Sequence, residues 1–152
     1  KTVMAIKNQF KMTILSQSAN ESFSRAAVVA FIAQLDPTVD ELADIKTAVS
    51  EAVTNCIVHA YREGEGRIYI DVKYDDKNVV TVKISDKGCG IEDVEQAMEP
   101  MYTTCTTGER AGLGFAVMQS FMDKLKVVST PGKGTSVTMT KQISKKDPQD
   151  HE

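Results

Sequence analysis

Two glycine-containing clusters, separated by a segment with no hydrophobic periodicity, place the strongest constraint on how this chain folds. The first cluster follows Asp86 and contains Gly88 and Gly90, and the second contains Gly112 and Gly114, where a helical pattern begins. Glycine lets a backbone approach a ligand closely because it has no Cβ atom. Free N–H groups at the start of a helix favour an anion such as phosphate. These features predict a nucleotide site beneath a loop that closes over it.

The segments around these clusters follow either the strand period or the helix period. Period-two patterns predict strands at residues 6–15, 67–74, 80–86, 125–129 and 135–143. Helical spacing predicts helices at residues 18–36, 38–64, 92–98 and 114–124. Because strands and helices are mixed without strict alternation, we expect a two-layer α+β sandwich with the helices on one face of the sheet.

Local signals add detail to this outline. Two capping boxes, Ser18-x-x-Glu21 and Thr38-x-x-Glu41, predict the starts of the first two helices, and Gly64 and Gly66 are expected to end the second. The first strand should turn one face inward, with Ile6, Phe10, Met12 and Ile14 on it. The last helix should bury Phe115, Met118, Phe121 and Met122.

Length and composition exclude several classes of protein. The 152 residues predict one domain at residues 1–144 and a polar tail at 145–152. The net charge of -3 gives no electrostatic reason for direct nucleic-acid binding, and no apolar run approaches the ~20 residues that cross a bilayer. No export signal precedes the cysteines, so we expect a cytoplasmic protein whose thiols are reduced, at Cys56, Cys89 and Cys105.

Two common phosphate motifs are absent. A dinucleotide fingerprint needs a third glycine where Val117 stands, and a P-loop needs a glycine where Val127 stands. What remains is a polar pair on the long helix, Glu51 and Asn55, which are four residues apart and share one helix face. Taken alone, this pair also fits an exposed helix edge.

Four short boxes occur in order along the chain: Glu51…Asn55, Asp86-x-Gly88-x-Gly90, Gly112-Leu113-Gly114 and Gly132-x-Gly134-Thr135. Their order and spacing resemble the Bergerat-type ATP-binding fold shared by gyrase B, the Hsp90 chaperones, histidine kinases and MutL. The resemblance implies a mixed, mostly antiparallel sheet. Within that superfamily, residues 20–25, 31–37, 50–55 and 109–115 resemble the anti-sigma F factors of endospore-forming bacteria.

The resemblance implies a role for each residue of an ATP and Mg²⁺ site. Asp86 would accept a hydrogen bond from the adenine amino group, with Thr135 supporting the same base. Asn55 would bind Mg²⁺, and Glu51 would be the general base. Further ATP contacts are expected from the glycine clusters and the loop, namely Gly88, Gly90, Ile91, Thr103, Thr104, Arg110, Gly112, Leu113, Gly114 and Phe115, with Arg110 also stabilising the transferring γ-phosphate.

The same resemblance implies a protein serine kinase that inhibits a sporulation sigma factor and phosphorylates an anti-anti-sigma protein on serine. It implies a homodimer, and it places Arg25 at the surface that contacts the protein partners. Three alternatives stay open on the residues alone: the catalytic domain of a sensor histidine kinase, a chaperone-like or gyrase-like ATPase, and a nucleotide-sensing module without chemistry.

Overall fold

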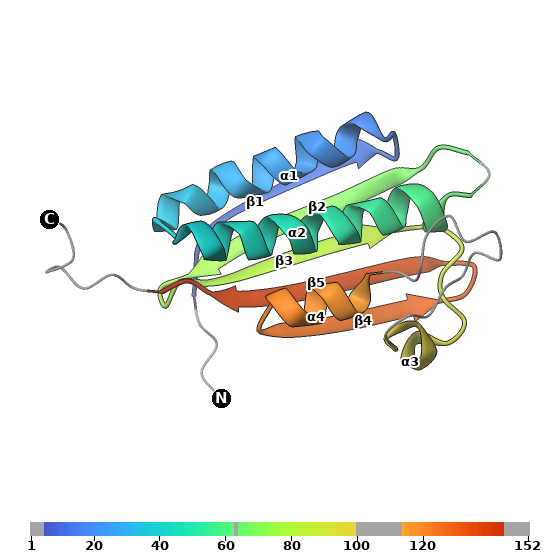
Figure 1. Cartoon of the computed structure of the whole chain (residues 1–152). Coiled ribbons are helices and arrows are strands. Elements are labelled where there is room, and N and C mark those ends of the chain that lie inside the picture. The colour runs from blue at the N-terminus through green and yellow to red at the C-terminus, as the bar shows by residue number, and fades with distance from the viewer. Residues whose placement is uncertain (1–4, 63, 100–113, 145–152) are drawn as a thin grey trace, which may run out of the picture.

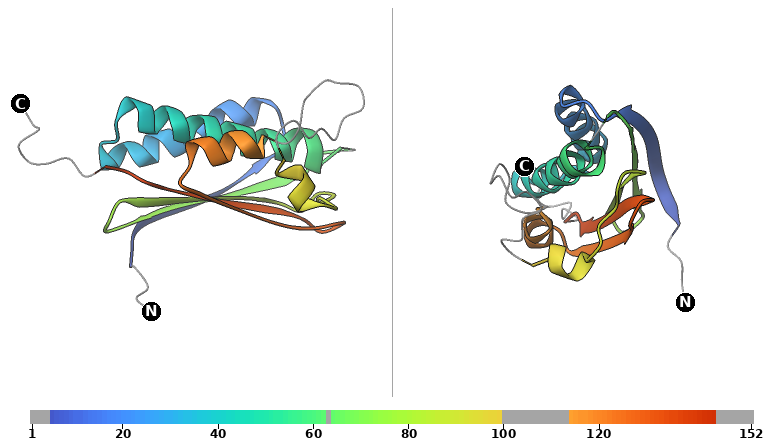
Figure 2. Two further views of the ribbon diagram at one scale, coloured as in Figure 1. Left: turned by 60° about the horizontal axis from the view of Figure 1, so that its bottom comes forward. Right: turned by 90° about the vertical axis from the view of Figure 1, so that its right-hand side faces the viewer.

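One antiparallel sheet and a layer of helices on one of its faces make up the fold (Figures 1 and 2). The computed structural model describes residues 5–62, 64–99 and 114–144. Over these ranges the sheet has the strand order β1-β2-β3-β5-β4, and all four pairings are antiparallel. The predicted two-layer α+β class is therefore confirmed, with a fully antiparallel sheet in the described part of the chain.

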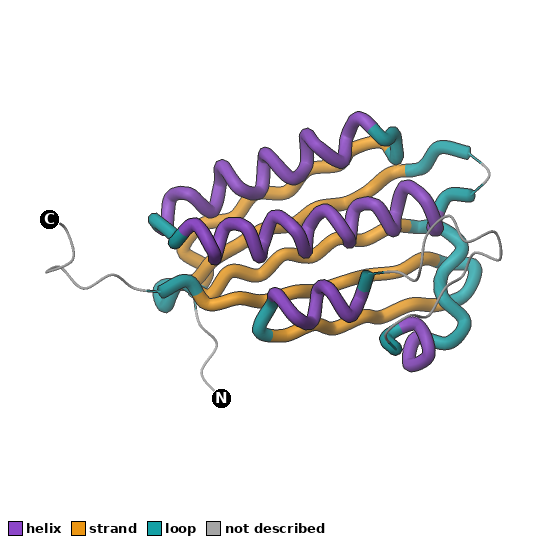
Figure 3. The backbone as a smooth tube through the Cα atoms, viewed as in Figure 1, coloured by secondary structure: helices purple, strands orange, loops and turns teal. Residues whose placement is uncertain are grey.

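The elements follow one another along the chain as a strand, two helices, a hairpin, two short helices and a second hairpin (Figure 3). Their bounds are β1 Ile6–Leu15, α1 Ala19–Ile32, the 3₁₀ turn η1 Ala33–Leu35, α2 Val39–Asn55, the π-helical turn η2 Cys56–Ala60, β2 Arg67–Asp75, β3 Val79–Asp86, α3 Val94–Ala97, α4 Phe115–Phe121, β4 Lys124–Thr130 and β5 Gly134–Gln142. None of the described helices has the length and apolar character to cross a membrane.

The core lies between the sheet and α2. Alternate residues of β2 and β3 are buried, as the period-two pattern predicts. The matching stripe of α2 includes Ile45, Val49 and Val53, whose side chains are fully buried. α2 contacts both α1 and α4, so it is the central helix of its layer.

One of the two predicted capping boxes is present. Thr38 accepts a hydrogen bond from the Glu41 backbone N–H at 3.1 Å, and the Glu41 side chain accepts one from the Thr38 N–H at 2.8 Å. The prediction for Ser18 is wrong, because Ser18 has helical backbone angles and makes no side-chain capping bond. The Glu21 side chain instead accepts a hydrogen bond from Ser50 on α2 and pairs with Arg25.

The long helix ends earlier than predicted, at Ala60 rather than at Gly64. The Ala60 carbonyl accepts a hydrogen bond from the Cys89 N–H at 3.0 Å, so a tertiary contact takes the acceptor that a further helical turn would use. Tyr61 then joins two neighbouring segments, because its hydroxyl donates to the Arg67 carbonyl and accepts from the Lys87 N–H.

Two side chains predicted to face the core are exposed. Ile6 is 50% exposed because the pairing of β1 with β2 shifts register between Ile6 and Asn8. Phe121 is 37% exposed because α4 ends there and the chain becomes extended at Met122, which is buried.

Candidate functional site

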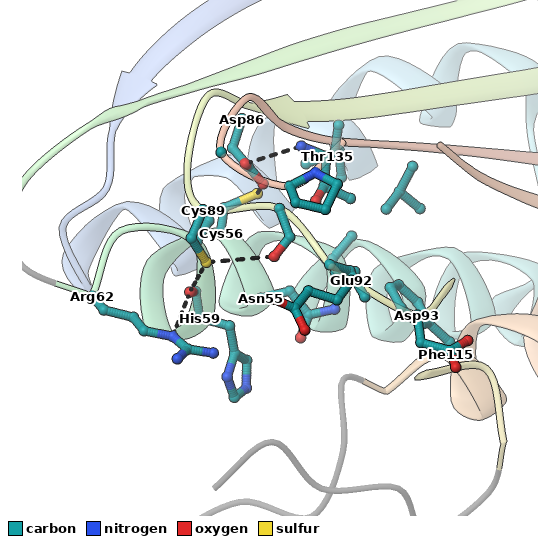
Figure 4. Close-up of a pocket in the computed structure, with 18 of the residues that line it drawn as sticks. Asn55, Cys56, His59, Arg62, Asp86, Cys89, Glu92, Asp93, Phe115 and Thr135 are labelled. Carbon is teal, nitrogen blue, oxygen red and sulfur yellow. Dashed lines mark hydrogen bonds between the residues drawn. The ribbon is translucent and has the colours of Figure 1, made fainter. Parts of the chain in front are cut away.

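A cavity of about 600 Å³ opens at the end of α2 that lies beside the β3–α3 connection (Figure 4). Its size is within the range of small-molecule sites, which is roughly 300–1,000 Å³. Of the residues predicted to bind a nucleotide, six line this cavity: Asn55, Asp86, Gly90, Ile91, Phe115 and Thr135. Four segments that are far apart in sequence therefore line one cavity.

The α2 wall of the cavity consists of Ala52, Asn55, Cys56 and His59. Their spacing of three and four residues is that of a single helix face. From the sequence we assigned a ligand-binding role only to Asn55 on this face, and the same spacing applied to Asn55 would also have found Ala52 and His59. His59 lies in the π-helical turn η2, an irregularity that is frequent at functional sites.

Asp86, the last residue of β3, is 9% exposed and tightly held. Its Oδ1 atom accepts hydrogen bonds from the N–H groups of Gly88 at 2.9 Å and Thr135 at 3.2 Å. Its Oδ2 atom accepts one from the Cys56 thiol at 3.4 Å. A buried carboxylate is costly unless such donors surround it. These three bonds therefore hold a hydrogen-bond acceptor in place at the cavity wall.

Thr135 reaches the cavity from the start of β5. Its hydroxyl shares a hydrogen bond of 2.8 Å with the Ser129 hydroxyl, which also accepts from the Ile91 N–H at 2.7 Å. Ser129, which sequence reasoning missed, thus ties β4, β5 and the first glycine cluster together. Nothing in its local sequence distinguishes it, because the contact depends on the pairing of β4 with β5.

Gly88 lies behind the cavity wall and is not one of its lining residues. A Cβ atom at this position would overlap the Ala60 backbone. The glycine therefore allows the first cluster to pack against the end of the long helix, which differs from the direct ligand approach expected from the sequence. Its contact with ATP stays a prediction.

Glu51 is also not among the lining residues, and its carboxylate lies against Gly114, at the start of α4. Gly114 has a φ of 70°, in the left-handed region, and a Cβ atom there would overlap the Glu51 carboxylate. The other predicted phosphate contacts, Thr103, Thr104, Arg110, Gly112 and Leu113, lie outside the described residues.

The described residues fit the expected metal. Among them no cluster of three or more His, Cys, Asp or Glu side chains is arranged to hold an ion. Mg²⁺ is bound by one or two protein oxygens together with phosphates and water. The side-chain oxygen of Asn55 is shielded from solvent at the cavity wall and is an oxygen ligand of that kind.

Comparison with known proteins identifies the family. A model of the histidine kinase-like ATPase domain matches residues 17–141. The anti-sigma F factor of Caldanaerobacter subterraneus subsp. tengcongensis is 58% identical over 142 residues, which are 93% of this chain and 99% of that protein. The chain belongs to the anti-sigma F factor family. The family's member from Bacillus subtilis (strain 168) is 50% identical over 141 residues, covering 92% of this chain and 96% of that one.

Solved structures show the same fold at lower identity. The structure of the RsbU and RsbW domains of Rv1364c from Mycobacterium tuberculosis superposes with a TM-score of 0.68 at 18% identity, covering 92% of this chain and 34% of that one. The catalytic domain of the histidine kinase ThkA has a TM-score of 0.51 at 16% identity, covering 93% and 97%. The predicted family and its enzyme class, a protein serine kinase on a histidine kinase-like ATPase domain, are confirmed.

Proposed function

We propose that this chain binds ATP with Mg²⁺ in the cavity, inhibits a sporulation sigma factor and phosphorylates an anti-anti-sigma protein on serine. The observation that carries the proposal is the single cavity that joins Asn55 on α2 to Asp86 on β3. An amide oxygen suited to a metal and a carboxylate suited to a base amino group therefore line the same cavity. The matches to anti-sigma F factors, over 93% and 92% of the chain, support a sigma factor as the partner.

Asp86 reads the base. Its carboxylate only accepts hydrogen bonds, so it pairs with the exocyclic amino group of adenine and not with the O6 atom that guanine carries there. The two backbone N–H groups on Oδ1 leave Oδ2 as the atom that faces the amino group. Thr135, which is bonded to Asp86 through its own N–H, supports the base through a bridging water.

The phosphates lie toward the start of α4. There the Gly114 backbone N–H would contact the anion, with Gly112 and Leu113 proposed as further contacts. Asn55 would hold Mg²⁺, which would supply positive charge to neutralise the phosphates. Thr103, Thr104 and Arg110 are proposed as further contacts to the triphosphate. Arg110 stabilises the charge that develops as the γ-phosphoryl group moves.

Glu51 acts as the general base. It lies one helical turn before Asn55, and its carboxylate rests against Gly114, so it is adjacent to the expected position of the phosphates. In this role it accepts the proton of the attacking serine hydroxyl as that oxygen bonds to phosphorus and ADP leaves.

Partner binding involves a different part of the molecule. Arg25 lies on α1, is partly exposed and pairs with Glu21 at 3.5 Å, and it is not among the residues that line the cavity. We place it at the surface that contacts the sigma factor and the anti-anti-sigma protein. The chain acts as a homodimer on which one sigma factor is held.

The experiment is phosphotransfer from labelled ATP in the presence of candidate sigma and anti-anti-sigma proteins. The label should appear on a serine of the anti-anti-sigma protein, and Glu51→Gln should slow transfer by roughly 10²-fold or more, because general base catalysis contributes about 10²–10⁴-fold. ATP affinity should change little. Glu95→Gln, which removes an exposed carboxylate from α3, is the matched control.

Two results would contradict this mechanism. Transfer by Glu51→Gln at the rate of the unmodified chain would remove Glu51 from the role of base. ATP binding without label on any partner would favour the nucleotide-sensing module in place of a kinase.

A further inference from the structure

Cys56 is the one described side chain that donates a hydrogen bond to the Asp86 carboxylate. It begins the π-helical turn η2, directly after Asn55, and its side chain lines the cavity. Both partners are buried, Cys56 at 3% and Asp86 at 9% exposure. The contact therefore joins the end of α2 to the end of β3 inside the candidate base pocket.

The two oxygens of Asp86 have different partners. Oδ1 accepts from two backbone N–H groups, those of Gly88 and Thr135. Oδ2 has only the Cys56 thiol among the donors given by the described residues, at 3.4 Å. Among the described residues, Cys56 is thus the one side chain that bonds directly to the oxygen assigned to the ligand.

We propose that Cys56 is a positioning residue that sets the preference of the pocket for adenine, by holding Asp86 Oδ2 where the exocyclic amino group of the base meets it. This inference rests on the proposed function, because it takes Asp86 to be the residue that reads the base. It assigns to Cys56 a part in nucleotide specificity, with no covalent chemistry at the thiol.

The chemistry of sulfur suits this task. A thiol is a weak donor, so it orients Oδ2 without saturating the lone pairs that accept from the base.

The test compares ADP with inosine 5′-diphosphate (IDP) by titration calorimetry on the full chain. Hypoxanthine carries O6 in place of the amino group of adenine and also a proton on N1. The ratio of the two affinities therefore measures how strongly the pocket prefers the adenine edge, which presents the amino donor to Asp86. Cys56→Ala removes the donor and should lower the ADP preference about 3- to 10-fold, since a net hydrogen bond contributes about 0.5–1.5 kcal/mol.

Cys56→Ser separates the donor from the packing. Serine and alanine differ by one hydroxyl group, so Cys56→Ser should keep the preference within about twofold of that of the unmodified chain, while both variants lose the volume of the sulfur. Cys89→Ala is the second control. Its thiol also lines the cavity but donates to the His59 and Gly90 carbonyls, so any effect should fall equally on ADP and IDP.

The outcomes separate this inference from the proposed function. If the unmodified chain prefers ADP and Cys56→Ala keeps that preference, Cys56 has no positioning role and the proposed function stands. If Cys56→Ser loses as much preference as Cys56→Ala, sulfur packing and not hydrogen bonding is responsible, and the inference is overturned. If the unmodified chain binds ADP and IDP equally, Asp86 does not read the base and both proposals fail.

Discussion

At the scale of single residues, the function proposed for Asp86 depends on its neighbours more than on its own chemistry. An aspartate that follows a strand is ordinary in a turn. Here three donors from three segments hold Asp86 at the cavity wall, and its carboxylate is partly exposed to the cavity. Because this negatively charged acceptor is already oriented, little conformational entropy is lost when it binds a donor from the ligand.

Replacing Asp86 with asparagine should weaken ADP binding about tenfold or more. The change removes the charge from a hydrogen bond that charge makes about twice as strong, and it places an amide N–H₂ where a base amino group would also donate. Calorimetry measures the loss. Asp71→Asn, which removes the same charge from the middle of β2, is the control and should leave affinity unchanged. An Asp86→Asn variant with unaltered affinity would contradict adenine recognition by this carboxylate.

At the scale of elements, α2 contributes both to the stability of the fold and to the candidate site. It begins at the Thr38 capping box and reaches the cavity at Asn55. Its first turn therefore stabilises the helix, and its last turn lines the cavity. The capped end also contacts the end of the chain's last described segment, because the Glu41 carboxylate accepts hydrogen bonds from the Ser144 N–H and hydroxyl, both at 2.9 Å.

Thr38→Ala should lower the free energy of unfolding by about 1 kcal/mol, the typical value of an N-cap side chain. Ser18→Ala is the matched control. Because Ser18 makes no capping bond, its replacement should cost less than about 0.5 kcal/mol. Urea denaturation of both variants measures the difference, and neither should change ADP affinity. Equal losses for the two variants would mean that the Ser18 hydroxyl caps α1 in solution.

At the scale of the whole molecule, the proposed partner surface and the candidate nucleotide cavity lie on different elements. α1 carries Arg25 and packs on α2, whereas the cavity lies between the end of α2 and the β3–α3 connection (Figures 1 and 4). Partner binding and nucleotide binding should therefore be separable by mutation.

Arg25→Ala should reduce retention of the sigma factor in a pull-down with ATP present, by about tenfold if Arg25 is an interface hot spot of roughly 1–2 kcal/mol. ADP affinity should stay the same, because the side chain does not line the cavity. Lys11→Ala removes one positive charge from the exposed part of β1 and is the control. Normal sigma retention by Arg25→Ala would exclude Arg25 from the interface.

Sequence reasoning worked where a pattern depends on near neighbours. The alternation in β2 and β3 predicts both strands and their buried faces, and the Thr38 box predicts a cap that the structure contains. It failed where a distant contact decides. The side chain of Glu21 bonds to Ser50 and Arg25 instead of completing a box with Ser18, and a register shift turns Ile6 outward.

The order of the elements and the two-layer class follow from the sequence, because hydrophobic period is a local property of the chain. The resemblance of four short boxes to a known family directed attention to Asn55 and Asp86. The end of the long helix at Ala60, the place of Gly88 behind the wall and the bond between Cys56 and Asp86 follow only from the tertiary structure. Each of these depends on which segment packs against which, and a contact between residues 30 positions apart leaves no periodic trace in the sequence.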